Sequence, residues 1–340
     1  MQDSNPLRGW RVDRDQVSFI GTGLQRPECV LAEKSGDLWV ADARGGVVHI
    51  EPGGQQRLVA QQAEVDQSST TKPESRLLSG TLPNGLAFDA SGDILIANFG
   101  TDRLEVMDRR DGTTRVLLDS IDGKPIGKVN FVLPDSRGRL WITVSTQVNP
   151  WINALRPELA DGYIVLLDSK GARIVADKLS FTNEVRLDRN EEFLYAVETM
   201  GNRITRFRVQ EDGQLTNRET FGPSSLGSGA PDGIAFDAYG NLWVTMIMAD
   251  KLLALTPEGE VLELLDDGNH EALEQMQSAM TTGTVPFDKM LNAKGTLAPW
   301  MASITFGGED LRTVYIGSLL GNTLAVFRSP VAGLPMLHWR

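Results

Sequence analysis

The sequence predicts an all-β protein: a six-bladed β-propeller with four antiparallel strands in each blade and an N-terminal strand that closes the last blade. One observation is a pattern that occurs six times within the 340 residues. A second is that alternating apolar strands follow the pattern, so that each repeat supplies four strands. A third is that no amphipathic helices alternate with these strands, as a parallel α/β fold would require. Because a single blade of about 50 residues buries too little surface to be stable alone, we expect residues 1–340 to form one propeller domain.

Each copy of the pattern has a polar residue near its start, then an apolar strand, a turn of the form D-x-x-G and a second apolar strand. In the last copy, G-G-E-D replaces the turn. The turns at Asp89, Asp135 and Asp237 resemble fragments of calcium loops, but a complete loop has ligands through position 12, so we interpret them as hairpin turns. The copies are RPECVLAEKSGDLWVAD (26–42), LPNGLAFDASGDILIAN (82–98), GKVNFVLPDSRGRLWITV (127–144), FTNEVRLDRNEEFLYAVE (181–198), APDGIAFDAYGNLWVTM (230–246) and MASITFGGEDLRTVYIGS (301–318).

A second pair of alternating strands, joined by a turn that contains glycine, follows the repeated unit. Before the first repeat, residues 16–23 (QVSFIGTG) form a predicted strand. We expect this strand to complete the last blade and so to tie the two ends of the chain together. Examples of the second pair are residues 46–60, 103–119, 163–177 and 251–267.

Three stretches do not fit the repeat: residues 60–80, 145–160 and 266–300. Residues 60–80 are polar, and we interpret them as a surface loop. Residues 145–160 contain Trp151, and residues 266–300 contain three Met residues and Trp300 and include a helix-like piece. They form either surface loops or the walls of a pocket.

The composition excludes several classes of protein. Cys29 is the only cysteine, so no internal disulfide forms, and the three histidines are scattered without zinc-ligand spacing. With 45 Asp and Glu against 33 Lys and Arg, the formal net charge of −12 argues against nucleic-acid and anionic-membrane partners. The chain shows no signal peptide and no apolar run that approaches ~18 residues, so we expect a cytoplasmic protein. The oligomeric state stays open.

The polar residue of each repeat is the candidate functional position. In a propeller the first strand of each blade lies beside the central channel, so equivalent residues point at a common axis. Buried polar groups need partners, and two neighbouring carboxylates repel. A divalent cation would resolve both problems, and oxygen ligands suit Ca²⁺ first and Mg²⁺ or Mn²⁺ next; the alternative is a water-filled channel without metal. The six residues are Glu28, Asn84, Asn130, Asn183, Asp232 and Ser303.

Several longer motifs occur together: PNGLAFD, the asparagine of KVNFV, TNEVRLD with LYAVET, PDGIAFDAYGNLWV and ITFGGEDLRTVYIGS. On these motifs, over about residues 16–339, the chain resembles the SMP-30/gluconolactonase/luciferin-regenerating-enzyme family of six-bladed propellers, and more distantly the calcium-dependent diisopropyl fluorophosphatases. Family members bind Ca²⁺, Zn²⁺, Mn²⁺ or Mg²⁺, so the identity of the ion stays open, with Ca²⁺ as the first choice. The metal ligands that the resemblance implies are Glu28, Asn130, Asn183 and Asp232.

The sequence departs from the family pattern beside these ligands. Cys-Val follows Glu28 where the family has Gly-Pro, Glu184 follows Asn183 where the family has Gly, and Lys128 stands where many lactonases have Arg. We therefore do not carry over sugar-lactone specificity. In a regular strand Glu184 would face away from Asn183, so we expect it to lie behind the ligands or to pack between blades.

The resemblance implies hydrolysis of a cyclic ester by a water molecule that the metal activates. Asp232 is the candidate that both holds the metal and takes a proton; the alternative is that it is a ligand only. Lys128 lies two residues before Asn130, on the same side of the strand, and is the candidate donor to a substrate oxygen, unless it is a structural lysine. Asn84 and Ser303 line the channel and are candidates for contact with substrate. Candidate apolar walls of the substrate site, which are otherwise core residues, are Trp151, Met246, Met248 and Trp300.

The leading hypothesis is a metal-dependent lactonase whose partner is a small-molecule lactone or ester. The alternatives are an organophosphate hydrolase that uses the same metal and Asp232, a non-enzymatic propeller that binds a ligand around a structural ion, and a condensing enzyme like strictosidine synthase. The sequence has no G-x-S-x-G motif, and no histidine lies near Cys29, so we expect no serine or cysteine nucleophile.

Overall fold

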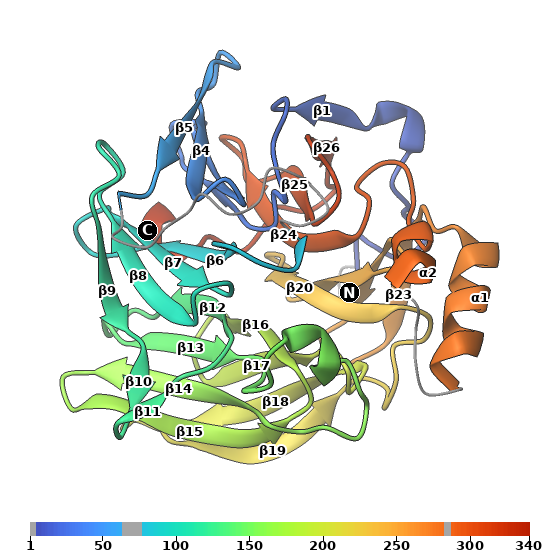
Figure 1. The fold of residues 1–340 in the computed structure, drawn as a ribbon. Helices are drawn as coiled ribbons and strands as arrows, with labels where there is room; N and C mark the ends of the chain where they lie inside the picture. Colours follow the sequence, from blue (N-terminus) through green and yellow to red (C-terminus); the bar gives the residue numbers. More distant parts are fainter. Residues whose placement is uncertain (1–4, 63–76, 282–286) are drawn as a thin grey trace.

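The fold is described here from a computed structural model, which describes residues 5–62, 77–281 and 287–340. Six four-stranded antiparallel sheets follow one another around a central axis, and the chain colours run around the ring in order (Figure 1). The prediction of a six-bladed β-propeller is therefore confirmed. Each sheet has the strand order of the sequence, with its first strand innermost, except that the sixth sheet takes its outer strand from the N-terminal region.

The strands of the six blades have the following bounds. The first three blades consist of β2 (Val30–Ala32), β3 (Leu38–Asp42), β4 (Gly46–Ile50) and β5 (Gln56–Ala60); β6 (Pro83–Phe88), β7 (Ile94–Asn98), β8 (Arg103–Met107) and β9 (Thr114–Leu118); and β12 (Val129–Pro134), β13 (Leu140–Val144), β14 (Gly162–Asp168) and β15 (Gly171–Leu179). The last three consist of β16 (Thr182–Leu187), β17 (Phe193–Glu198), β18 (Arg203–Val209) and β19 (Leu215–Phe221); β20 (Ala230–Phe236), β21 (Leu242–Ile247), β22 (Lys251–Leu255) and β23 (Val261–Asp266); and β24 (Met301–Gly307), β25 (Thr313–Ser318), β26 (Leu324–Arg328) and β1 (Ser18–Ile20).

The N-terminal strand closes the ring, as predicted. Strand β1 pairs antiparallel with β26, and Phe19 lies opposite Ala325. Because the strands of this blade come from both ends of the described chain, the first and last parts of the sequence hold one another in place. The side chain of Leu7 is buried in the same region, in a cluster with Trp243 and Phe327.

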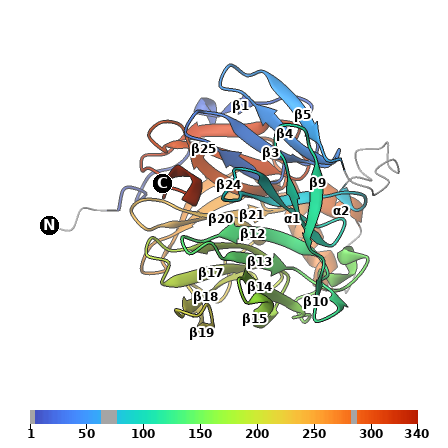
Figure 2. The same cartoon turned by 90° about the vertical axis from the view of Figure 1, so that its left-hand side faces the viewer.

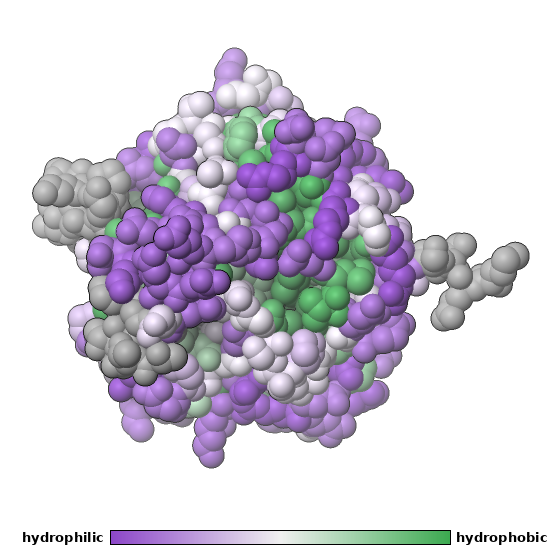
Figure 3. Space-filling view, turned by 90° about the vertical axis from the view of Figure 1, so that its right-hand side faces the viewer, coloured by the Kyte–Doolittle hydropathy of each residue, from purple (hydrophilic) through white to green (hydrophobic). Residues whose placement is uncertain are grey.

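Helices are few and lie outside the blades. Residues 266–300, for which a helix-like piece was predicted, contain α1 (His270–Thr281) and α2 (Phe287–Asn292), which lie beside the fifth blade (Figure 1). Figure 3 shows this side of the molecule, where an area of hydrophobic residues is bordered by hydrophilic ones. No helix among the described residues has the length and apolarity to cross a bilayer. The smaller elements are the hairpin of β10 (Ser120–Ile121) and β11 (Lys124–Pro125) and the 3₁₀ turns η1 (Arg14–Gln16), η3 (Trp151–Ala154) and η4 (Leu337–Trp339).

The aspartate turns of the repeat are hairpin turns, as predicted. The carboxylate of Asp237 accepts hydrogen bonds from the backbone N–H groups of Tyr239 and Asn241, and its second oxygen accepts one from the indole of Trp243 at 2.9 Å. Asp135 accepts the indole N–H of Trp141 in the same way, at 2.9 Å. The D-x-x-G-x-L-W pattern thus stabilises the turn and fixes a buried aromatic ring with one carboxylate.

Five innermost strands carry a β-bulge at the repeated polar position. In β12, for example, Val129 lies opposite Val144 and Phe131 opposite Thr143, so that Asn130 is the extra residue. A bulge leaves the extra residue unpaired and turns its side chain away from the alternation of the strand. The same shift of register occurs at Asn84, Asn183, Asp232 and Ser303.

Small residues beside the bulges let neighbouring blades approach closely. A Cβ atom on Gly233 would lie 2.3 Å from the carbonyl oxygen of Ala302 in the next blade, and one on Gly85 would lie 2.5 Å from the ring of Phe131. The glycine of the Pro-Asn-Gly and Pro-Asp-Gly sequences is therefore needed for packing between blades.

The two ends of the channel differ. The innermost strands begin at the end where the predicted metal ligands and the loops 145–160 and 266–300 lie. They finish at the other end, where the C-terminal segment lies; Figure 2 shows the C-terminus and α2 on opposite sides of the molecule. Of the predicted loop 60–80, residues 63–76 lie outside the described residues.

Candidate metal and active site

The six polar residues of the repeat are all buried at the start of the innermost strands, with relative exposures of 2–5%. Contacts join them across blade boundaries. The side-chain amide of Asn183 donates to the carboxylate of Asp232, and that of Asn84 donates to the backbone oxygen of Asn130 at 3.1 Å. The hydroxyl of Ser303 donates to the backbone oxygen of Glu28 at 2.6 Å. The structure thus brings the six positions together, as the repeat predicted.

Three side-chain oxygens of this group are buried without a hydrogen-bond partner among the described residues. They are Oε2 of Glu28, Oδ1 of Asn130 and Oδ1 of Asn183. The amide of Asn183 is held by Thr199 and Asp232 through its nitrogen, which leaves its oxygen free to accept. Unpartnered buried oxygens are costly, and they occur here at three of the four predicted metal ligands.

These oxygens fit a hard divalent cation. Two carboxylates and two amide oxygens are the donor set that Ca²⁺ and Mg²⁺ prefer. Among the described residues, no group of three or more His, Cys, Asp and Glu side chains could hold a metal. An ion at the axis would therefore depend on Asn130 and Asn183 as well as on the two carboxylates.

Burial raises the pKa of both carboxyl groups in the cation-free protein. Burial raises the pKa of Glu28 well above its usual range; the charge of Arg26 opposes this, and Asp232 and Glu184 add to it. Burial and the charge of Glu184 raise the pKa of Asp232 to about 8, against Arg26 and the hydrogen bond from Asn183. Without a cation, the carboxyl group of Asp232 therefore holds a proton in most of the molecules at neutral pH.

Glu184 is buried between the fourth and fifth blades, as expected for a residue that packs between blades. The bulge that follows Thr182 places both Asn183 and Glu184 in the interior, and Glu184 is 1% exposed. Its carboxylate forms an ion pair with Arg186 at 2.9 Å and accepts the backbone N–H of Ile234 in the next blade. Burial raises the pKa of Glu184 to about 7, and Arg186 opposes that shift.

The sequence analysis missed Arg26. Its guanidinium donates to the side-chain oxygen of Asn84 at 2.7 Å and to the backbone oxygen of Pro83 at 3.2 Å. Burial lowers the pKa of Arg26, while Glu28 and Asp232 raise it. The available signal was its position two residues before Glu28, at the spacing that places two side chains on one side of an extended chain.

Lys128 is buried near the metal ligands, with its ammonium 2.8 Å from the carboxylate of Asp102. The same ammonium lies 6.0 Å from the ring centroid of Phe99. Asp102 has a positive φ of 59°, which holds this carboxylate in the turn between β7 and β8. The lysine is thus fixed in place by its partner, and a substrate oxygen would have to share its N–H groups with Asp102.

Two of the predicted apolar residues lie in clusters formed by the long loops. Trp151 packs edge-to-face on Phe99 at 5.5 Å and contacts Phe181, the residue that leads into β16. Trp300 is buried, and its indole donates to the backbone oxygen of Ala293. Met246 and Met248 are buried in the same cluster as Trp300. The loops 145–160 and 266–300 therefore cover the end of the channel where the metal ligands lie.

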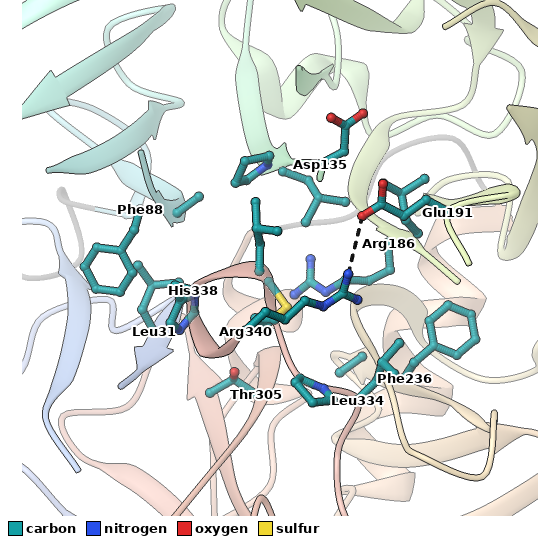
Figure 4. Close-up of a pocket in the computed structure, with 18 of the residues that line it drawn as sticks. Leu31, Phe88, Asp135, Arg186, Glu191, Phe236, Thr305, Leu334, His338 and Arg340 are labelled. Atoms are coloured by element: carbon teal, nitrogen blue, oxygen red, sulfur yellow. Dashed lines mark ion pairs between the residues drawn. The ribbon is translucent and has the colours of Figure 1, made fainter. Parts of the chain in front are cut away.

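A separate cavity of about 660 Å³ lies at the opposite end of the channel (Figure 4). None of the six repeat residues lines it. Cys29 does not line it either; its thiol is buried and accepts the backbone N–H of Leu86, as expected for a packing residue. The predicted metal and active site and this cavity therefore lie at two different places in the molecule.

The comparison with protein families decides the classification. A model described as "SMP-30/Gluconolactonase/LRE-like region" matches residues 26–268. The chain belongs to this family. The resemblance that the sequence motifs suggested is thereby confirmed, and the match covers the first five blades.

Individual relatives of this family member are distant. The chain is 27% identical over 166 residues to 6-deoxy-6-sulfogluconolactonase of Pseudomonas putida, which covers 48% of this chain and 47% of the relative. The chain spans about half the length of the first curated relatives it matches. Among solved structures, a gluconolactonase of Xanthomonas campestris matches with a TM-score of 0.66 at 19% identity, covering 94% of this chain and 89% of that one. Regucalcin of Agrobacterium tumefaciens, a calcium-binding protein, matches with a TM-score of 0.67 at 16% identity, covering 95% and 98%.

Proposed function

We propose that this protein is a divalent-cation-dependent lactonase that opens a cyclic ester at the loop-covered end of the central channel. Family membership supports a lactone hydrolase. The observation that carries the cation dependence is the set of three buried, unpartnered oxygens on Glu28, Asn130 and Asn183, beside the carboxyl group of Asp232. Ca²⁺ is the first choice of ion, because every donor in the set is oxygen.

The residues of the chain have separate roles in this proposal. A cation held by Glu28, Asn130, Asn183 and Asp232 would polarise the lactone carbonyl and lower the pKa of a water molecule. Asp232 accepts the proton of the attacking water as the general base. Lys128 donates a hydrogen bond to a substrate oxygen and turns toward it from Asp102. The loops that carry Trp151, Met248 and Trp300 exclude bulk water.

Two other functions are compatible with the same residues. An organophosphate hydrolase would direct the same water at phosphorus, and a non-enzymatic propeller would hold a structural ion and bind a ligand without turnover. The family relatives named as lactonases favour the first proposal over both.

The test is a substrate panel on the wild type and on Asp232→Asn. The wild type with Ca²⁺ should open lactones faster than it hydrolyses organophosphates. Asp232→Asn should lose at least about 100-fold in kcat/KM, the usual contribution of a general base, while its circular dichroism is unchanged. Asp111→Asn, an exposed aspartate in a turn, is the matched control. Full lactone turnover by Asp232→Asn would contradict the role of Asp232, and preference for organophosphates would favour the second function.

A further inference from the structure

Five of the six axial residues fall into two groups, which differ in what their side chains contact. The side-chain oxygens of Glu28, Asn130 and Asn183 named above are buried without a hydrogen-bond partner among the described residues. The side chains of Asn84 and Ser303 are just as buried, at 2% exposure each, but neighbouring groups engage them. The second group therefore has a role other than that of a metal ligand.

Arg26 holds the side chain of Asn84 in one orientation. Its guanidinium donates to Oδ1 of Asn84 at 2.7 Å and to the backbone oxygen of Pro83 at 3.2 Å. Because the amide oxygen faces Arg26, the amide nitrogen is directed to the third blade, where it donates to the backbone oxygen of Asn130 at 3.1 Å. A cation on Oδ1 would lie against the guanidinium, and the amide nitrogen only donates, so Asn84 is a poor metal ligand.

Ser303 makes the equivalent contact at the boundary between the last and the first blade. Its hydroxyl donates to the backbone oxygen of Glu28 at 2.6 Å. The backbone of Gly317 packs directly against this pair, since a Cβ atom there would lie 1.9 Å from the oxygen of Glu28 and 2.8 Å from the hydroxyl oxygen. A water molecule therefore has little room to replace the hydroxyl.

Both contacts run from one blade to the next around the ring, and both end on the backbone carbonyl of a predicted metal ligand. Asn130 is the extra residue of a bulge, and Glu28 lies before the first strand of its blade, so neither has a partner residue in the ladder of its own sheet. A buried carbonyl outside the ladder needs a donor from elsewhere. Asn84 and Ser303 supply this donor and fix the peptide unit from which each ligand side chain projects.

We propose that Asn84 and Ser303 are positioning residues for the cation, which hold the peptide units of Asn130 and Glu28 so that the side-chain oxygens of these two ligands stay directed at the ion. Arg26 completes the first contact by orienting Asn84. This role rests on the proposed cation site, and it replaces the contact with substrate that the repeat suggested for the two residues. Loss of a group that holds a metal ligand in place costs about 10- to 100-fold in metal affinity.

The test is isothermal titration calorimetry of Ca²⁺ into the full chain after a chelator has removed bound cations. We expect Asn84→Ala and Ser303→Ala each to bind Ca²⁺ at least roughly tenfold more weakly than the wild type. Arg26→Lys keeps the positive charge near the ligands but loses the fork that holds both Pro83 and Asn84. It should therefore weaken Ca²⁺ binding roughly three- to tenfold, as for one lost hydrogen bond.

Ser329→Ala is the matched control. The hydroxyl of Ser329 is buried and donates at 2.6 Å to a backbone oxygen, like that of Ser303, but the acceptor is Val331, which is not an axial residue. Thermal melts of the cation-free proteins measure the structural effect of each substitution. We expect Ser329→Ala to lower the Tm about as much as Ser303→Ala does, and to leave the Ca²⁺ affinity unchanged.

The proposal is overturned if Asn84→Ala and Ser303→Ala both bind Ca²⁺ with wild-type affinity; a raised KM for lactones in that case would show that the two side chains contact the substrate. It is also overturned if Ser329→Ala loses as much Ca²⁺ affinity as they do. A wild type that binds no Ca²⁺ would contradict the cation dependence of the proposed function itself, so the two failures are distinguishable.

Discussion

Lys128 either pairs with Asp102 only or also donates a hydrogen bond to the substrate, and kinetics can distinguish these two roles. In the structure it pairs with Asp102 at 2.8 Å, and it is nearly inaccessible to solvent. A lysine with only a structural role would affect stability, whereas a lysine that contacts the substrate would affect the rate constants. The proposed function requires that Lys128 contacts the substrate.

We therefore expect Lys128→Met to lower kcat/KM for lactones about 10- to 100-fold, as for loss of a charged hydrogen bond. Lys128→Arg should recover part of that loss, because the guanidinium can still donate to both partners. The measurement is steady-state kinetics with the ion at saturation. Lys124→Met, at an exposed position of the nearby hairpin, is the control. A variant that loses stability but keeps wild-type kcat and KM would show that Lys128 is structural.

Individual site residues were predictable to different degrees. The repeat marked six equivalent positions, and the family resemblance selected Glu28, Asn130, Asn183 and Asp232 among them as the predicted metal ligands. Arg26 and Asp102 were not found, since neither is repeated in the other blades, and their contacts depend on loops between blades.

The β-bulge is the element that makes the site. A regular strand would pair Asn183 and turn Glu184 to the opposite side, whereas the bulge buries both. The sequence pattern predicted the strands and their turns correctly, but not the bulges. One extra residue in a strand leaves the alternation of apolar residues intact before and after it, so the pattern does not reveal the bulge. Glu184 nevertheless packs between blades, as expected, since its carboxylate accepts the backbone N–H of Ile234 in the next blade.

Glycine beside the bulge sets how closely two blades approach. We expect Gly233→Ala to lower the free energy of unfolding by about 1–3 kcal/mol, because its Cβ would lie 2.3 Å from the backbone oxygen of Ala302. Gly53→Ala is the matched control: nothing lies within 4 Å of a Cβ there, so it should change stability by less than about 0.5 kcal/mol. Denaturant unfolding measures both. Equal stability of the two variants would contradict the close packing of the fifth and sixth blades.

The ring as a whole concentrates buried acidic groups at its axis, and this affects its stability. The pKa of Asp232 is raised to about 8 and that of Glu28 is raised well above its usual range, so the cation-free folded protein binds more protons than the unfolded chain. These two groups therefore stabilise the folded protein most at low pH, and this contribution to the free energy of unfolding is lost as the pH rises from about 4 to about 8. A bound cation stabilises the ionised forms and opposes this loss.

We accordingly expect the difference in Tm between Ca²⁺-loaded and chelated protein to grow as the pH rises from about 5 to about 8. Differential scanning fluorimetry at matched ionic strength measures it. In Asp232→Asn the difference should be smaller and should depend less on pH. A difference that is constant over this range would contradict coupling between proton release and ion binding.

Blade number, closure and the axial residues of the molecule were predictable because they follow from the repeat and from the strand at residues 16–23. The far cavity was not, since the segment 334–340 that covers it shows no pattern of its own and is placed by a few contacts with Phe236 and Ala32.

Anomalous diffraction from crystals grown with Mn²⁺, which accepts the same oxygen ligands as Ca²⁺, tests the central claim most directly. The proposal predicts one strong anomalous peak on the channel axis, within roughly 2.0–2.6 Å of side-chain oxygens of Glu28, Asn130, Asn183 and Asp232. A channel axis without a peak, or a peak bound only by residues elsewhere on the molecule, would contradict it.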